Sequence, residues 1–223
     1  MDFLTTCLLF VCGLLGVRLV QLLISVKRGQ GASAVIPRTK PARTMIVMGS
    51  GGHTAEMLRI VERLDSERYS PRQYVIANTD KTSVVKVIES EIRRQPDPAK
   101  QTYEIITITR SRDVHQSYIS SIVTTTLALF NCIPIVLKAQ PELILTNGPG
   151  TCVPICLVAF LARLLFINTK CRIVFIESFC RVRSLSLSGR ILLYIVDMFV
   201  VQWPELLEQT ASTREDVRCF GRL

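Results

Sequence analysis

The stretch Thr44-Met-Ile-Val-Met-Gly-Ser-Gly-Gly-His-Thr54 decides the fold, because it predicts a short apolar strand that runs into a glycine-rich turn. Met57, Leu58, Val61 and Leu64 follow at three- and four-residue steps, which is the spacing of an amphipathic helix. A strand, a glycine turn and a helix in this order are typical of the start of a Rossmann-like domain.

The glycine turn has the features of a phosphate-binding site. Glycines let backbone N–H groups approach a ligand closely, and the N-terminus of the following helix carries partial positive charge. The candidate phosphate-binding residues are therefore Gly49, Ser50, Gly51, Gly52 and Thr54. A tight turn without a ligand is the alternative for the same pattern.

Apolar strands alternate with helical patterns along the rest of the chain. We expect strands at residues 73–78, 103–109, 142–146, 172–176 and 199–202, and helices at residues 81–94, 119–137, 154–167 and 185–196. Pro134 is expected to break the helix of residues 119–137. The alternation predicts one α/β domain with a mostly parallel, doubly wound sheet that is covered on both faces.

Composition limits the class of protein. A chain of 223 residues is long enough for one well-cored domain and an appendage. Its 48% hydrophobic content is high for a purely soluble protein, and its net charge of +9 calls for an anionic neighbour such as a membrane, a nucleic acid or a phosphorylated ligand. The eight cysteines form no CxxC or His/Cys cluster, which favours a reducing cytosolic compartment and predicts no metal site.

The first residues predict a membrane anchor. Residues 3–26 are almost entirely apolar and long enough for one crossing, and basic residues follow them but do not precede them. We therefore expect an anchor helix at residues 1–28, a basic linker at 29–43 and a cytosolic Rossmann-like domain at 44–223. Arg18 is costly in a bilayer centre, so a helix lying in the membrane surface is the alternative. The apolar stretches 119–137 and 154–167 are expected to be core helices, one of which could present an apolar face to the membrane.

Polar residues gather where the predicted strands end. Because parallel strands end at the same edge of a sheet, these residues predict one functional cleft. His53 and Glu177 are candidate general bases, with turn capping as the alternative role. Arg181 and Arg183 are candidate diphosphate ligands, with anionic lipid as the alternative. The other cleft residues we expect are Arg110, Arg112, Asn147, Gly148, Gly150, Thr151 and Ser178.

Several ordered motifs carry a family resemblance. They include Gly49-Ser-Gly-Gly-His-Thr54, Asn147-Gly-Pro-Gly-Thr151, Glu177-Ser178 and Gln202-Trp-Pro204. Together they resemble the membrane-anchoring subunit of the UDP-N-acetylglucosamine transferase of the dolichol-linked oligosaccharide pathway. The turn is also similar to that of the bacterial transferase that glycosylates a lipid-diphosphate-linked sugar.

The resemblance implies the acceptor-side half of a split GT-B glycosyltransferase. The complex would transfer N-acetylglucosamine (GlcNAc) from UDP-GlcNAc to GlcNAc-diphosphodolichol on the cytosolic face of the endoplasmic reticulum. A soluble donor-binding subunit would complete a heterodimer, with the tail from Val217 as a docking element and other enzymes of the pathway as further partners. No cofactor is implied, and no DxD pair at a strand end suggests a metal.

Two other function classes remain open from the residues. The domain could be a passive membrane anchor without a catalytic role. It could also be an NAD(P)-binding reductase, although the turn lacks the GxGxxG spacing and no acidic residue follows the second strand. Nucleic-acid binding is not expected, because the cations cluster beside the anchor rather than among aromatic residues.

Overall fold

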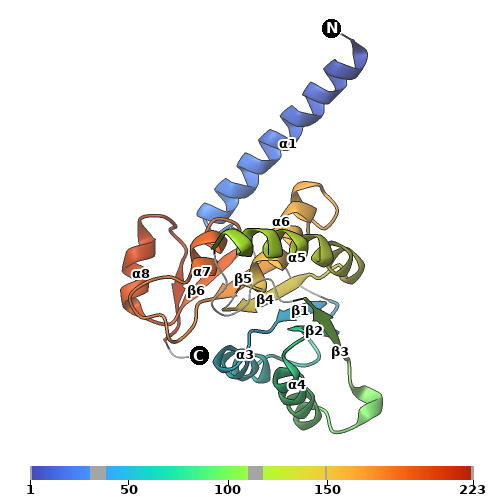
Figure 1. Cartoon of the computed structure of the whole chain (residues 1–223), viewed down its shortest axis with the longest axis vertical. Coiled ribbons are helices and arrows are strands. Elements are labelled where there is room, and N and C mark those ends of the chain that lie inside the picture. Colours follow the sequence, from blue (N-terminus) through green and yellow to red (C-terminus); the bar gives the residue numbers. More distant parts are fainter. Residues whose placement is uncertain (1, 31–38, 110–117, 149, 222–223) are drawn as a thin grey trace.

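The computed structural model describes residues 2–30, 39–109, 118–148 and 150–221, with α-helices and strands alternating after a long N-terminal helix (Figure 1). The strands are β1 (Thr44–Val47), β2 (Arg72–Ala77), β3 (Tyr103–Ile108), β4 (Leu143–Asn147), β5 (Arg172–Ile176), β6 (Met198–Val201) and β7 (Arg218–Cys219). The helices are α1 (Phe3–Lys27), α3 (Gly52–Glu62), α4 (Lys81–Arg94), α5 (Tyr118–Ala139), α6 (Cys152–Leu164), α7 (Leu187–Leu192) and α8 (Pro204–Ala211), with a 3₁₀ turn η1 (Pro98–Lys100).

The strands form one seven-stranded parallel sheet in the order β3-β2-β1-β4-β5-β6-β7. From β1 the chain adds β2 and β3 on one side, then returns to place β4 on the other side of β1. The direction of the connections therefore reverses between β1 and β4. In doubly wound sheets a ligand crevice lies at such a reversal, beyond the carboxyl ends of the strands.

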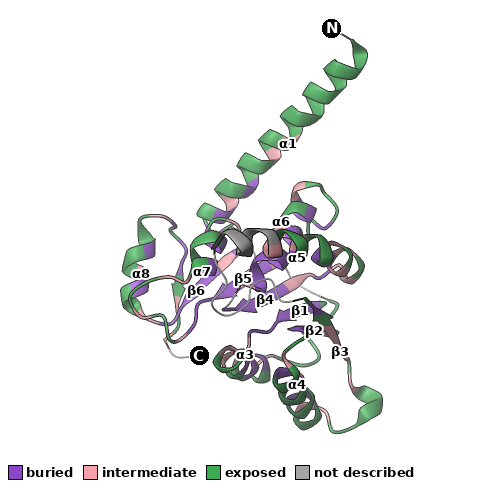
Figure 2. Ribbon diagram, viewed as in Figure 1, coloured by how far each residue is buried: buried purple, intermediate pink, exposed green. Residues whose placement is uncertain are grey.

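Both faces of the sheet are buried, which the alternation of side chains along β1 shows directly. Met45 and Val47 pack in a core with α5, α6 and α7, whereas Ile46 and Met48 pack in a second core with α3 and α4. All four are at most 2% exposed. Successive side chains of a strand point to opposite faces, so β1 is buried on both faces and its sequence is apolar from Met45 through Met48, the residue after it. Figure 2 shows the strands of the sheet interior buried between these two layers.

The helix α1 projects from the domain on the side covered by α5 and α6 (Figures 1 and 2). It is long and apolar enough to cross a membrane. Leu22 and Val26 are buried near its C-terminal end, where it packs on α6. The Arg18 guanidinium lies 4.8 Å from the centre of the Phe166 ring. Arg18 is therefore at the junction of helix and domain, where a cation can interact with an aromatic face.

The predicted fold class is confirmed. The structure differs from the prediction in the helices α5, α7 and α8. Pro134 does not break α5, which runs through it. A proline removes one backbone hydrogen bond, but Cys132 and Val136 on either side of it are buried and hold both halves of the helix against the core. The helix α8 was not predicted, although Pro204 at its first turn and Glu205 are typical of a helix start. The expected helix of residues 185–196 is reduced to the six residues of α7.

Candidate functional site

The glycine turn after β1 is held in place by the side chain of Thr54. The Thr54 hydroxyl donates to the Gly49 carbonyl over 2.5 Å and lies 2.6 Å from the hydroxyl of Ser83 on α4. Gly51 has a φ of +64°, and a Cβ added at Gly51 or Gly52 would meet no atom within 4 Å. The turn is thus anchored on its inner side, while Gly51 and Gly52 face open space at the α3 N-terminus. A ligand phosphate fits this arrangement.

His53 lies in the first turn of α3 and is held by the end of β4. Its Nδ1 lies 2.9 Å from Oδ1 of Asn147. Gly148 has a φ of +91°, and a Cβ there would lie 2.4 Å from Nδ1 of His53. A side chain at position 148 would therefore displace the imidazole. These contacts join the carboxyl ends of β1 and β4, which flank the reversal of the sheet.

Glu56 joins the same cluster, although it is not among the site residues predicted from the sequence. Its Oε2 accepts from Nδ2 of Asn147 over 2.9 Å and from the Phe179 backbone N–H over 3.3 Å. Its Oε1 accepts from the Ser178 hydroxyl over 3.1 Å. Glu56 follows His53 by three residues, so both side chains lie on one face of α3. This three-residue spacing from His53 is the sequence signal by which Glu56 could have been predicted.

Glu177 is fully buried, and its carboxylate holds the loop that follows β5. Oε1 accepts from the Ser178 backbone N–H over 3.0 Å. Oε2 accepts from the backbone N–H and the hydroxyl of Ser186, over 2.9 and 3.0 Å. Gly189 lies directly against it, because a Cβ there would approach Oε2 to 2.4 Å. Glu177 therefore holds the two ends of the segment 177–189 close together.

The end of β6 is tied to the same loop. The indole N–H of Trp203 donates to the Phe179 carbonyl over 2.7 Å, and the two rings lie 5.1 Å apart. Gln202 donates to the Glu177 carbonyl over 3.0 Å. The turns after β1, β4, β5 and β6 are thus linked at one edge of the sheet, as the sequence predicts.

The other predicted site residues lie around this cluster. Arg181 and Arg183 are exposed on the loop after β5. Thr151 is buried at the start of α6, and Gly150 precedes it. Arg110 and Arg112 lie outside the described residues. Within the described part of the chain, no group of three or more His, Cys, Asp or Glu residues could hold a metal.

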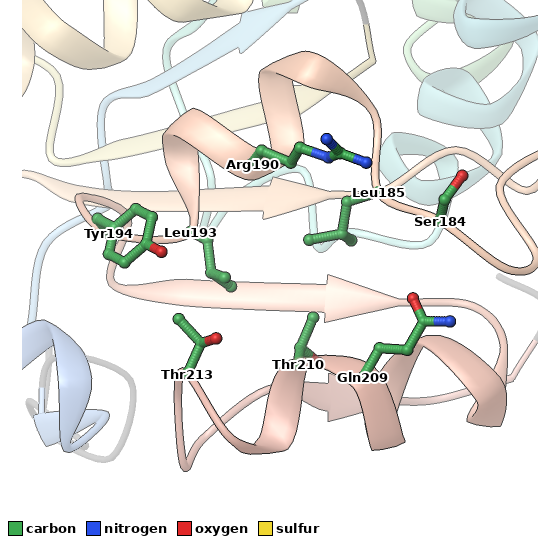
Figure 3. Close-up of a pocket in the computed structure, with 8 residues that line it drawn as sticks. All are labelled: Ser184, Leu185, Arg190, Leu193, Tyr194, Gln209, Thr210 and Thr213. Carbon is green, nitrogen blue, oxygen red and sulfur yellow. The ribbon is translucent and has the colours of Figure 1, made fainter.

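A separate pocket lies between α7 and α8 (Figure 3). It has a volume of about 290 Å³ and is lined mainly by uncharged side chains, among them Leu185, Leu193, Tyr194 and Thr210. Arg190 is the charged residue of its lining. None of the predicted site residues lines it, so it is distinct from the cluster around His53.

Comparison with known proteins gives the family. The family model described as "Oligosaccharide biosynthesis protein Alg14 like" matches residues 44–220, which is the whole of the sheet domain. The chain belongs to this family. The match includes the glycine turn, the Asn147 loop and the loop after β5.

Three curated relatives are similar over most of their length, and each is named "UDP-N-acetylglucosamine transferase subunit ALG14". The chain is 48% identical to the Mus musculus protein, covering 80% of this chain and 83% of the relative. It is 48% identical to the Homo sapiens protein, covering 74% and 77%. The identity to the Schizosaccharomyces pombe protein, spelled "alg14" in its name, is 43%, covering 73% and 76%.

Among solved structures, the fold resembles that of MurG from Acinetobacter baumannii, with a TM-score of 0.52 at 14% sequence identity. The alignment covers 74% of this chain but 42% of the MurG chain. This member of the Alg14-like family therefore shares its fold with less than half of that larger protein.

Proposed function

We propose that this chain is the membrane-anchored, acceptor-side half of a UDP-N-acetylglucosamine transferase. The observation that carries the proposal is the cluster at the reversal of the sheet, where an open glycine turn, a helix N-terminus and the His53 imidazole meet. The relatives, which are named as subunits of a UDP-N-acetylglucosamine transferase, support it. The donor is UDP-GlcNAc, and the acceptor is GlcNAc-diphosphodolichol, in the second step of dolichol-linked oligosaccharide assembly.

In this proposal the acceptor binds across the ends of β1 and β4. The N–H groups of residues 49–54 and the α3 dipole hold its diphosphate, aided by Arg181 and Arg183 from the loop after β5. His53 takes the proton from the acceptor hydroxyl, whose oxygen forms a bond to the anomeric carbon of the donor. The bond from that carbon to the UDP oxygen breaks, and UDP leaves. Glu177, the other candidate base, shapes the loop, because its buried carboxylate already accepts three hydrogen bonds.

A partner subunit holds the donor. The described sheet is one Rossmann-like half, and the chain covers 42% of the MurG chain. We propose a heterodimer with a soluble donor-binding subunit, recruited to the membrane by this chain. The segment that begins with β7 is a suitable docking element, because β7 is the edge of the sheet and Phe220 beside it is 61% exposed.

Membrane attachment follows from α1 and its surroundings. Its 25 residues span about 38 Å, enough for a hydrocarbon core of about 30 Å. Lys27 ends α1, and Arg28, Lys40 and Arg43 follow it; by the positive-inside rule these charges support a sheet domain on the cytosolic side. We propose the endoplasmic reticulum as the membrane, since dolichol-linked sugars are assembled there.

The proposal is tested by reconstituting the full chain with the donor-binding subunit in vesicles that contain a GlcNAc-diphosphate lipid. Transfer of a second GlcNAc from UDP-GlcNAc is measured. We expect His53→Ala to lower kcat by about 10²- to 10⁴-fold, the range for general-base catalysis. His53→Asn is the matched variant: its amide can still donate to Asn147 but has no basic nitrogen, so it should be equally impaired. Both variants should co-purify with the partner as the wild type does.

Two outcomes would contradict the proposal. Equal kcat for wild type and both His53 variants would remove the catalytic role. Product formation by the partner alone, when an unrelated helix attaches it to the vesicle, would make this chain a passive anchor. A further arm removes the residues after Val217; retained co-purification would show that the partner docks elsewhere.

A further inference from the structure

Glu56 receives hydrogen bonds from three directions. The amide of Asn147, the hydroxyl of Ser178 and the backbone N–H of Phe179 all point their donors at its carboxylate. A carboxylate that accepts from three donors needs no proton of its own and has none to give. Because this carboxylate only accepts, the donor and acceptor of the hydrogen bonds from Asn147 onward can be assigned.

The side chain of Asn147 is oriented by Glu56. Only its NH₂ group can face a carboxylate favourably, so its Nδ2 lies on Oε2 of Glu56 at 2.9 Å. The amide oxygen is then forced to the opposite side, where it lies 2.9 Å from Nδ1 of His53. An amide oxygen can only accept. Therefore Nδ1 of His53 must carry the hydrogen.

A neutral imidazole carries one hydrogen, so Nε2 holds the free electron pair. This is the nitrogen on the other side of the ring from Asn147. Gly148 packs against the imidazole ring and limits its movement on that side. A Cβ added at Gly148 would lie 2.4 Å from Nδ1 and 2.6 Å from Cε1 of His53. The carboxylate thus determines, two side chains away, which nitrogen of His53 can accept a proton.

We propose that Glu56 is a positioning residue that acts through Asn147 to hold His53 in the form with Nδ1 protonated and Nε2 free. The use of Nε2 to accept the proton of the acceptor hydroxyl rests on the proposed function. The tautomer itself does not, because it follows from the hydrogen bonds alone. A purely structural Glu56 would join α3 to the ends of β4 and β5 and leave the tautomer of His53 unaffected.

The tautomer is measured on the full chain in nanodiscs, labelled with ¹⁵N-histidine, by long-range ¹H–¹⁵N correlation. The sequence has two histidines, and His115→Gln assigns the signals of His53. We expect a protonated Nδ1 and an unprotonated Nε2 in the wild type. Glu56→Ala should give a mixture of the two tautomers, whereas Glu56→Gln, whose amide oxygen still accepts from Asn147, should keep the wild-type form. A wild type protonated at Nε2, or an unchanged tautomer in Glu56→Ala, would overturn the inference.

The kinetic test uses the complex with the donor-binding subunit. Because small errors of placement cost up to about 100-fold in rate, Glu56→Ala should lower kcat by about 10- to 100-fold with acceptor KM changed by less than about threefold. Glu56→Gln should restore most of the rate. Glu62→Ala is the matched control, since it removes an exposed carboxylate of the same helix that pairs with Arg93. A rate loss in Glu56→Ala that Glu56→Gln does not rescue would indicate a structural role only.

The two proposals fail separately. If His53→Ala is fully active while Glu56→Ala changes the tautomer, the proposed base is wrong and the positioning by Glu56 stands. If His53→Ala is inactive while the tautomer in Glu56→Ala is that of the wild type, His53 remains the base and the inference about Glu56 is wrong.

Discussion

At the scale of single residues, each of the two candidate bases lies against a glycine. Gly148 contacts the half-buried imidazole of His53, and Gly189 contacts the fully buried carboxylate of Glu177. A methyl group at either position would collide with the candidate base. The consequences differ, because the ring of His53 lies beside the open turn whereas Glu177 is enclosed by the loop it holds.

We expect Gly148→Ala to impair catalysis more than folding. Alanine at a φ of +91° costs about 1–2 kcal/mol of strain, and the displaced imidazole loses its contact with Asn147. Gly189→Ala is the comparison, and it should mainly destabilise the protein, by about 3 kcal/mol, because it breaks hydrogen bonds to a buried carboxylate. Chemical denaturation and transfer assays on both variants check this. Equal loss of stability in the two variants would contradict the distinction.

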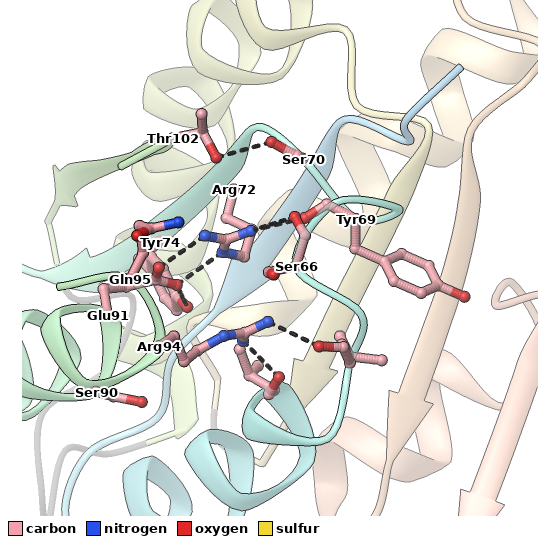
Figure 4. A network of polar contacts seen from close by, with 12 residues as sticks. Ser66, Tyr69, Ser70, Arg72, Tyr74, Ser90, Glu91, Arg94, Gln95 and Thr102 are labelled. Atoms are coloured by element: carbon pink, nitrogen blue, oxygen red, sulfur yellow. Dashed lines mark hydrogen bonds and ion pairs between the residues drawn. The ribbon is translucent and has the colours of Figure 1, made fainter. Parts of the chain in front are cut away.

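At the scale of elements, a buried ion pair attaches α4 to β2 (Figure 4). Glu91 on α4 accepts two hydrogen bonds of 2.7 Å from Arg72 at the start of β2, and one from the Tyr74 hydroxyl. Burial alone would raise the pKa of Glu91, but the bonds from Arg72 and Tyr74 outweigh it and the pKa is lowered. Arg94 adds bonds from α4 to the carbonyls of Val61 and Leu64, at the end of α3. The orientation of α3, which carries His53 and Glu56, depends on this network.

Glu91→Gln should lower the free energy of unfolding by about 3–5 kcal/mol, because it leaves the Arg72 charge buried without its partner. In the wild type, the folded pKa lies below the unfolded value near 4.5, so the stabilisation is present above that pH and is lost as pH falls. Denaturation at neutral pH and near pH 4 checks both points. Glu104→Gln, on the exposed side of β3, is the control and should change stability by less than about 0.5 kcal/mol. If the stability of Glu91→Gln falls between neutral pH and pH 4 as much as that of the wild type, a group other than Glu91 causes the acid destabilisation.

At the scale of the whole molecule, α1 leaves the domain beside an exposed apolar surface. Leu127 and Phe130 on α5, Leu161 on α6, and Phe166 after it are 43–61% exposed. The helices α5 and α6 lie on the same side of the sheet as α1 (Figure 1), and Arg18 contacts Phe166 at the junction. Arg18 therefore has an aromatic partner at the junction, and this contact offsets part of the cost of a cation in the apolar helix.

Spin labels on the full chain in nanodiscs should distinguish the two sides of the domain. Labels at Phe130 and Phe166 should be accessible to oxygen dissolved in lipid and shielded from a polar nickel reagent, because apolar side chains beside a membrane helix favour the interface. A label at Val85, which is 53% exposed on α4 across the sheet, should show the reverse. Identical accessibility at all three positions would mean that this surface does not meet the bilayer.

The sequence by itself determined the order of strands and helices up to β6, the long apolar helix and the edge at which polar residues gather. These features depend on periodicity and on the geometry of parallel strands, which are local properties of the chain. The continuity of α5 through Pro134 was not predictable in this way, since burial on both sides of the proline decides it. The assignment of particular roles to Arg181, Arg183 and Thr151 stays a prediction.

Only the tertiary structure decided how the candidate site is connected. Glu56 meets Asn147 across 91 residues and Ser178 across 122, and no local pattern records such contacts. Likewise, Glu177 and His53 were both candidate bases in the sequence, but Ser186 and Gly189 fold back to enclose Glu177. The sequence places chemistry at the end of each strand through local rules. Which of those groups touch is set by the strand order, because the reversal between β1 and β4 brings His53 and Asn147 side by side.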